Sequence, residues 1–269
     1  ISVTGVQTCA LPIFITGSFG ATSSRFAGMA VENDLAAGVG ASYAIVKYKM
    51  GKWSTDFRGK QEFVMRPDGD GVASSIEVVI LRASKVKSKI YYEGYEDGAS
   101  KPPVCFSSNG VAPDPRAQTK QANACAICPK NVSGSRIDEN GQARGKACRD
   151  NKRIALVPLG DLHNESLGGP MLLRIPAASL NDFATYGNAL TAEGFQYFAV
   201  ATKISFDIEQ SYPKMVFQGT RVLKDHEADI VIAHLNNKEQ LDRIIAEDTS
   251  DFGAAPSGQA LLRSEEHTS

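Results

Sequence analysis

The sequence contains few of the side chains that most often perform catalysis at neutral pH. Only four of its 269 residues are histidine. Three of them, His163, His226 and His234, form no Ser/His/Asp, Cys/His or His-x-x-x-His arrangement. The pair Gly168-Gly169 lacks the following Lys-Ser/Thr that a phosphate-binding loop requires. We therefore expect a protein without catalytic activity.

A long apolar run is also missing, so we expect no bilayer-spanning helix and no membrane partner. The stretch from Val6 to Phe19 is not preceded by the basic residues of a secretory signal. A Cys-x-x-Cys pair in a chain without such a signal fits a reducing compartment better than a disulfide framework. We therefore expect a cytoplasmic protein.

The two ends of the chain differ from the rest. Residues 1–13 (ISVTGVQTCALPI) and 263–269 (RSEEHTS) resemble the translated sequencing-adapter tails found on contaminated metagenomic assemblies. Neither is expected to belong to the natural protein, and Cys9 is therefore not counted among its cysteines. The natural chain is expected to extend beyond both ends of residues 14–262. The remainder, about 250 residues, allows one large domain or two small ones.

Four cysteines form the clearest motif in the chain. Cys105, Cys125, Cys128 and Cys148 follow the order C-x19-C-x2-C-x19-C, with a tight central pair and one further thiol on each side. Such a set can close around one tetrahedral ion. The intervening sequence is rich in Gly, Ser, Asn and Pro and has little apolar periodicity, so it needs an added constraint to fold.

Zn²⁺ is the metal that these four cysteines are predicted to bind, because four thiolates complete a structural tetrahedral site. An iron–sulfur cluster accepts the same four thiolates and is the alternative cofactor. Unligated thiols or a disulfide are the alternatives without a metal. Because four thiolates leave no open position, the motif indicates a structural role.

Short alternating and β-branched segments predict a mainly β fold. The expected strands occupy residues 41–50, 53–63, 75–82, 90–95, 152–158, 171–175, 197–206 and 214–223. A helix is expected to begin at Ser179, with Asp182 as its capping-box partner, and to end at Gly194. Residues 225–247 are expected to form helical turns interrupted at Asn236-Asn237.

Three strands, a helix and two further strands are the order of an OB-fold. We therefore predict an α+β chain built on an OB-like β-barrel with a zinc-stapled loop insertion and C-terminal helices; a β-sandwich is the alternative. The expected parts are an N-terminal segment (14–40), the barrel domain (41–223) with the four-cysteine insertion (102–150), a helical segment (224–247) and an acidic disordered tail (248–262).

Charge is distributed unevenly along the chain. Residues 41–101 hold 11 Lys and Arg against 8 Asp and Glu, and residues 102–153 hold 9 against 4. Residues 154–262 hold 7 against 14. A basic region of this size is typical of an anion-binding face, although two solvated faces that happen to differ explain the charge equally well.

Cations interleaved with aromatic residues predict a surface for single-stranded nucleic acid, since such a surface needs charge for phosphates and flat rings for bases. The alternative is that the aromatic residues simply fill a core, as about half of strand residues do. The candidate contacts are Lys47, Lys49, Lys52, Trp53, Lys87, Lys89, Tyr91, Arg136, Arg144, Lys146, Arg149 and Arg153.

A resemblance supports the same direction. It rests on three runs: Pro103 to Gly110; Cys125-x-x-Cys128-Pro129-x-Asn131-x-x-Gly134-Ser135; and Gly145 to Cys148. Together with the Met171–Pro176 strand and Tyr212-Pro213-Lys214, they resemble a family of bacteriophage and prophage four-cysteine proteins. Most members of this family are uncharacterised, and the resemblance implies a protein like those that bind single-stranded DNA. The resemblance implies that the cysteines are ligands, that Asn131, Gly134 and Ser135 shape the knuckle, and that the chain acts in a bacterial host that is infected or carries a prophage.

Three functions follow as hypotheses. The first is a phage-type single-stranded-DNA-binding protein acting in DNA replication or recombination. Its tail, with Glu247, Asp248 and Asp251 before Phe252, loosely resembles the acidic tails that dock replication proteins. The second is a zinc-stabilised structural or interaction protein. The third is a metal-dependent nuclease, for which the sequence offers Asp150-x-Lys152 but no second carboxylate obviously paired with it.

Overall fold

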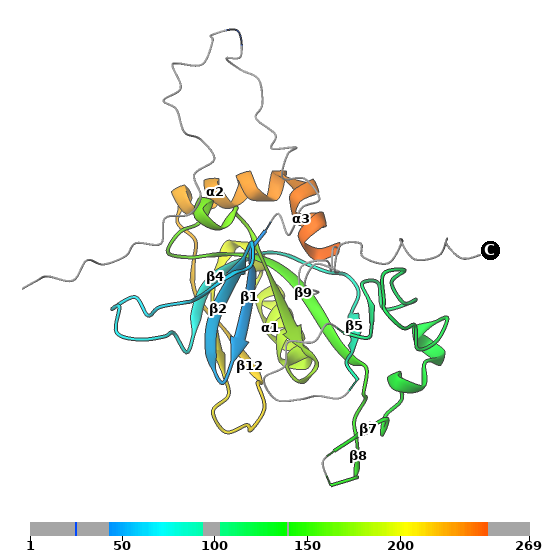
Figure 1. Cartoon of the computed structure of the whole chain (residues 1–269). Helices are drawn as coiled ribbons and strands as arrows, with labels where there is room; N and C mark the ends of the chain where they lie inside the picture. The colour runs from blue at the N-terminus through cyan, green and yellow to red at the C-terminus, as the bar shows by residue number, and fades with distance from the viewer. Residues whose placement is uncertain (1–24, 26–42, 94–102, 139, 247–269) are drawn as a thin grey trace, which may run out of the picture. The chain divides into compact units, whose positions relative to one another are not determined.

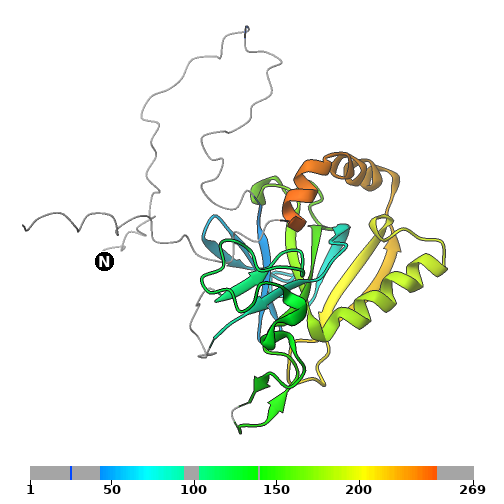
Figure 2. The same ribbon diagram turned by 90° about the vertical axis from the view of Figure 1, so that its right-hand side faces the viewer.

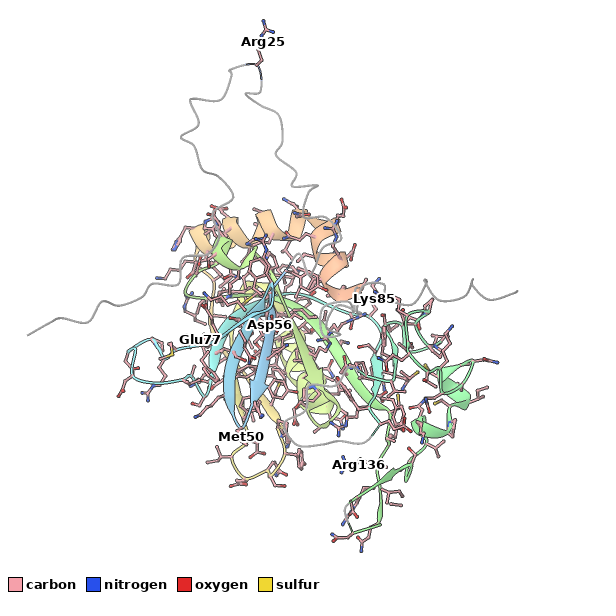
Figure 3. The ribbon with its side chains drawn as sticks, in the orientation of Figure 1. Arg25, Met50, Asp56, Glu77, Lys85 and Arg136 are labelled. Carbon is pink, nitrogen blue, oxygen red and sulfur yellow. The ribbon has the colours of Figure 1, made fainter. Side chains whose placement is uncertain are left out.

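A computed structural model describes Arg25 and residues 43–93, 103–138 and 140–246. The chain divides into two compact units, residues 1–37 and 38–269. Arg25 is the one described residue of the first unit (Figure 3), and all the described helices and strands belong to the second. Arg25 apart, the predicted segment 14–40 lies outside the described residues, as do the tail 248–262 and both atypical ends.

A mixed sheet forms the centre of the second unit. Its strands are β1 (Ile45–Lys49), β2 (Lys52–Phe57), β3 (Lys60–Phe63), β4 (Ile76–Ala83), β5 (Ser88–Tyr91), β6 (Cys105–Ser107), β9 (Arg149–Pro158), β10 (Met171–Pro176), β11 (Val200–Phe206) and β12 (Met215–Val222). They lie in the order β12-β11-β4-β9-β10-β1-β2-β3, with β5 branching from β9 and carrying β6. β1 and β10 run parallel, and the other neighbours are antiparallel.

The sheet is strongly rolled. Trp53 of β2 stacks on Phe206 of β11 with ring centroids 4.7 Å apart, and Tyr48 of β1 lies against both rings. In a flat sheet β2 and β11 would be separated by five strand spacings, or about 24 Å. The stacking therefore requires the sheet to curl so that its two ends approach each other. Among the described residues, no ladder joins β12 to β3, so the strands do not close into a barrel.

Helices cover both faces of this sheet (Figures 1 and 2). On the inner face, the helix α1 (Leu180–Ala192) packs against the core through Leu180, Phe183 and Tyr186. On the outer face, α2 (Asp225–Asn236) and α3 (Lys238–Ala246) bury Val231 and Leu241 against β4 and β9. Each helix thus removes one apolar stripe of the sheet from water.

β9 shows why the sequence folds this way. Ile154 and Leu156 point into the inner core, whereas Ala155 and Val157 point into the outer one, and all four are fully buried. This alternation is the period of two that a strand imposes on its side chains. A strand with both faces covered must be apolar throughout, as the run from Ile154 to Val157 is.

The beginning of α1 differs from the prediction. The Ser179 hydroxyl does not cap the helix but accepts the backbone N–H of Met215 at 2.7 Å. Asp182 instead forms an ion pair with Lys214, at 3.4 Å. The predicted capping box is therefore wrong, because the neighbouring β12 competes for the same hydroxyl. The end of the helix is as predicted, and Gly194 adopts a left-handed φ of 80°.

The predicted fold class is confirmed at the level of a mainly β, α+β chain with C-terminal helices. The described strands form one large sheet and a two-stranded ribbon, not the two packed sheets of the alternative β-sandwich. The break predicted at Asn236-Asn237 separates α2 from α3. In the described part of the chain, no helix has the length and apolar character needed to cross a membrane.

Candidate functional site

The four predicted metal ligands line one small cavity. Cys105, Cys125, Cys128 and Cys148 are all buried and form no disulfide. They surround a volume of about 10 Å³ together with the side chain of Asn131. A cavity of this size admits one water molecule or one ion and no larger ligand. The structure thus brings together four thiols that are spread over more than forty positions of the sequence.

Backbone hydrogen bonds place each thiol. Cys105 begins β6, which is paired with β5. Cys125 and Cys128 lie on a tight turn in which the Cys128 N–H donates to the Cys125 carbonyl at 3.4 Å. The Cys148 N–H donates to the carbonyl of Lys130 at 2.8 Å. The central pair is therefore linked to Cys148 through the backbone of Lys130, and the Cys125 N–H donates to the Val111 carbonyl at 2.8 Å.

Two polar side chains brace this turn. Asn131 donates to the Cys125 carbonyl at 2.8 Å. Ser135 donates to the Lys130 carbonyl and accepts the Ala147 N–H, both at 2.9 Å. These bonds link the central pair to the strand that follows Cys148.

The donor set fits a thiophilic metal, but the side chains are not drawn together around one. In the described residues, no group of three or more His, Cys, Asp or Glu side chains is arranged to hold a metal ion. Burial raises the pKa of the Cys148 thiol to about 12, and Lys89 opposes this shift while the other three thiols add to it. Four thiolates confined in this way would be stable only next to a cation.

A small apolar core supports the cysteines. Ile90, Tyr91 and Phe106 are buried against Cys105 and Cys148, separately from both cores of the sheet. The sequence predicted no core in this segment, because its apolar residues are too few and irregular to form a periodic pattern. β5, which precedes the segment, supplies two of them.

Basic residues follow β9 out of the sheet and onto the four-cysteine extension. Ser88 of β5 pairs with Asn151 of β9, which places Lys87 beside Lys152. Arg149 begins the same strand and is exposed. Lys146 lies three positions before Arg149, and its ammonium donates to the Asn131 side chain at 3.3 Å. Among the described residues, neither Arg149 nor Lys152 has an ion-pair partner.

The half-buried Lys130 extends this set, since its carbonyl accepts the Cys148 N–H and its ammonium lies 5.2 Å from the centre of the Tyr91 ring. We call these residues the β9 basic track: Lys87, Lys130, Lys146, Arg149 and Lys152.

One carboxylate reduces the charge of the track. Asp150 accepts a hydrogen bond from Lys89 and lies 3.6 Å from Lys87. Burial raises the pKa of Asp150, but hydrogen bonding and the charges of Lys89, Lys87 and Lys146 outweigh it and lower the pKa overall. Asp150 is therefore charged at neutral pH and offsets one cation of the track, whereas Arg149 and Lys152 have no ion-pair partner among the described residues.

Four of the predicted contacts lie inside the protein. Trp53 and Tyr91 are core side chains, 0% and 6% exposed. Arg153 is 2% exposed and donates to the Ser108 carbonyl at 3.2 Å. Lys89 is buried and bonded to Asp150 and Asn131. Because a base or phosphate cannot reach them without unfolding, we leave all four out of the proposed interface.

The other predicted contacts are at the surface, but some are neutralised. Lys47 pairs with Asp56 at 2.7 Å, and Arg144 pairs with Asp138 at 3.1 Å. Lys49 and Lys52 flank the β1–β2 turn beside Met50, and Arg136 lies in β7 (Arg136–Ile137), which pairs with β8 (Ala143–Arg144) at the far end of the extension (Figure 3). These positions are separate from the sheet end of the β9 basic track.

A cleft beside the track was not predicted from the sequence. It lies on the inner face, between α1 and strands β4 and β9, and has a volume of about 400 Å³. Its walls include Phe183, Tyr186 and Tyr197, and two cations of the track, Lys87 and Lys152, border it. The periodicity of α1 predicted Phe183 as a core residue, and no sequence signal shows that part of this face is left open.

No family model matches the chain, and comparisons with curated proteins and with solved structures found no match.

Proposed function

We propose that this protein binds single-stranded DNA, in replication or recombination, through the β9 basic track. The observation that carries the proposal is that Arg149 and Lys152 stand on one strand without an ion-pair partner among the described residues, between Lys87 on one side and Lys146 on the other. Single-stranded nucleic acid needs cations along its phosphates, and the track supplies five, of which Asp150 offsets one.

Zn²⁺ held by Cys105, Cys125, Cys128 and Cys148 is part of this proposal. The ion would close the cavity that the four thiols line and neutralise their combined negative charge. Lys130 and Lys146 are attached to the same segment, since one bonds to Cys148 through its backbone and the other to Asn131 through its side chain. A closed metal site would therefore fix two cations of the track relative to β9. An iron–sulfur cluster is the alternative occupant.

The rolled sheet supports the finer fold proposal of an OB-like barrel. Its curvature brings β2 and β11 into contact, as a small barrel requires. A single helix, α1, stands between β10 and the final hairpin, as in an OB-fold.

A fluorescence-anisotropy titration of a labelled oligonucleotide tests the function. The track has five cations, and Asp150 offsets one of them, which leaves four phosphate contacts. Four contacts predict a slope of about −3 for log affinity against log salt, so the affinity should fall about 50-fold between about 50 and about 200 mM salt. Absence of binding at the lower salt concentration contradicts the proposal. A duplex of the same sequence is the control, and tighter binding of the duplex than of the single strand would contradict the proposed preference.

A second function, a zinc-stabilised interaction protein, is favoured by apolar side chains on the extension. Ile127, Val132 and Ile137 are 74%, 57% and 61% exposed. Three exposed large apolar side chains on one extension offer a surface that a partner could cover. Light scattering at several protein concentrations separates the two functions: self-association that Ile127→Ser abolishes, in a protein that does not bind DNA, would favour the second.

A further inference from the structure

The cleft between α1, β4 and β9 has the properties of a nucleotide site. Its volume of about 400 Å³ falls within the range of about 300–1,000 Å³ that small-molecule pockets occupy. Its floor is apolar, formed by Ile80 and Ala83 of β4, while Leu180 and Phe183 of α1 line one side. A floor and wall of this kind favour a flat apolar group over a hydrated one.

The aromatic residues of the cleft are held in place. Tyr186 shares a hydrogen bond of 2.8 Å with the Thr202 hydroxyl, and its ring stacks on Phe217 with centroids 6.1 Å apart. Tyr197 stands at the rim, 38% exposed, with its ring edge-on to Phe198. A fixed wall and an accessible ring at the rim would let a planar group stack without ordering the protein further.

The charge of the cleft has one sign. Lys87 and Lys152 border it, and no Asp or Glu is among the described residues that line it. Asp150, which does not line the cleft, forms an ion pair with Lys87 at 3.6 Å and offsets its charge. Lys152 is therefore the main anion-binding group of the cleft. Asn188 of α1 adds an amide that can both donate and accept a hydrogen bond, as a base edge requires.

We propose that this cleft receives one nucleotide of the bound single strand, with its base against Tyr197 and the apolar floor and its phosphate at Lys152. The inference rests on the proposed function and gives it a specific base-binding site. The cleft opens at the inner end of the β9 basic track, because Lys87 and Lys152 belong to both. The phosphates on either side of the inserted nucleotide can then follow the track.

The test compares Tyr197→Ala with Phe195→Ala. Both residues are exposed aromatics on the loop after α1, 38% and 42% exposed, but only Tyr197 lines the cleft. Each variant is titrated with labelled oligo(dT) and with a strand of the same length in which every base is missing. Loss of one stacking contact should weaken oligo(dT) binding by about 5- to 150-fold for Tyr197→Ala, corresponding to about 1–3 kcal/mol. Phe195→Ala should bind like the wild type.

The baseless strand separates stacking from folding and charge. Tyr197→Ala should bind it as tightly as the wild-type protein does, whereas Lys152→Ala should bind both strands more weakly. Lys203→Ala, a cation on β11 outside the cleft, is the control for charge.

If Tyr197→Ala binds oligo(dT) like the wild type, the cleft is not used and DNA binding stands without it. An equal loss on both strands also overturns the inference, because no base is then involved. If the wild-type protein binds neither strand, the proposed function fails and the cleft assignment with it.

Discussion

Replacing Cys125 by serine should open the four-cysteine extension and leave the sheet folded. The segment has its own small core, in which Ile90, Tyr91 and Phe106 are the large buried side chains. Their burial contributes about 5–9 kcal/mol at about 1.5–3 kcal/mol each. That gain is smaller than the conformational entropy lost in ordering a segment this long, so the segment also needs the metal as a constraint.

Limited trypsin digestion measures this opening directly. Six Lys and Arg residues lie between Cys105 and Cys148, and each becomes a cleavage site once the segment is loose. We expect rapid cleavage there in Cys125→Ser and slow cleavage in the wild-type protein. Elemental analysis should find about one Zn²⁺ per wild-type chain, as four thiolates bind one ion, and less in the variant.

Ala126→Ser is the matched control, since it places the same hydroxymethyl group on the exposed neighbour of Cys125. It should keep both the metal and the protease resistance. Unchanged resistance of the segment in Cys125→Ser would refute the reasoning, and so would wild-type protein that carries no metal yet resists digestion.

Two further predictions concern the sheet and its outer helices. Trp53→Ala should destabilise the protein by about 3–5 kcal/mol in urea unfolding, since it removes a fully buried ring stacked on Phe206; a loss below about 1 kcal/mol would mean that the sheet is not rolled around this contact. Hydrogen bonds from Arg221 and from the Lys224 backbone hold the pKa of Glu227 at about 2, down from 4.5. The ionised form therefore stabilises the fold above pH 4.5, and this contribution is lost as the pH falls towards 2. Because Arg221 is partly exposed, the loss should be about 1 kcal/mol; Glu227→Gln should remove this pH dependence in thermal unfolding, whereas Glu239→Gln, at an exposed pair, should not.

The local pattern of the sequence predicted most elements of the fold. Alternation and β-branching located the strands that became β1, β4 and β9, because each side chain in a strand experiences one face of the sheet. The break between α2 and α3 was visible as Asn236-Asn237. Such features depend on residues a few positions apart, so they can be derived without knowing the fold.

Features that depend on distant pairings could not be derived. Trp53 is an aromatic residue among cations, so the sequence predicts that it stacks on a base. It is a core residue because the rolled sheet places it against Phe206. Ser179 stands where the sequence predicts a helix N-cap, but its hydroxyl accepts the backbone N–H of Met215 in β12 instead. Arg153 sits in a basic run, yet strand alternation directs it inward towards Ser108.

The candidate site was predicted in part for the same reason. The spacing of the cysteines is a local signal, and the structure gathers all four around one cavity. The cleft arises where β5 branches from β9 and α1 leaves part of the inner face uncovered, which no short stretch of sequence encodes. The role proposed for Lys152 also depends on a distant pairing, because the pairing of β5 with β9 sets it beside Lys87 at the cleft.

The salt dependence of single-stranded DNA binding by Arg149→Ala/Lys152→Ala tests the central claim most directly. Removing two phosphate contacts should reduce the steepness of the plot of log affinity against log salt by about 1.4. The matched pair Lys203→Ala/Lys238→Ala removes two cations that have no ion-pair partner in the described residues and lie on β11 and α3. This control should keep the wild-type slope. Equal slopes for the two double variants would contradict the central claim, because the β9 basic track would then not be where the phosphates bind.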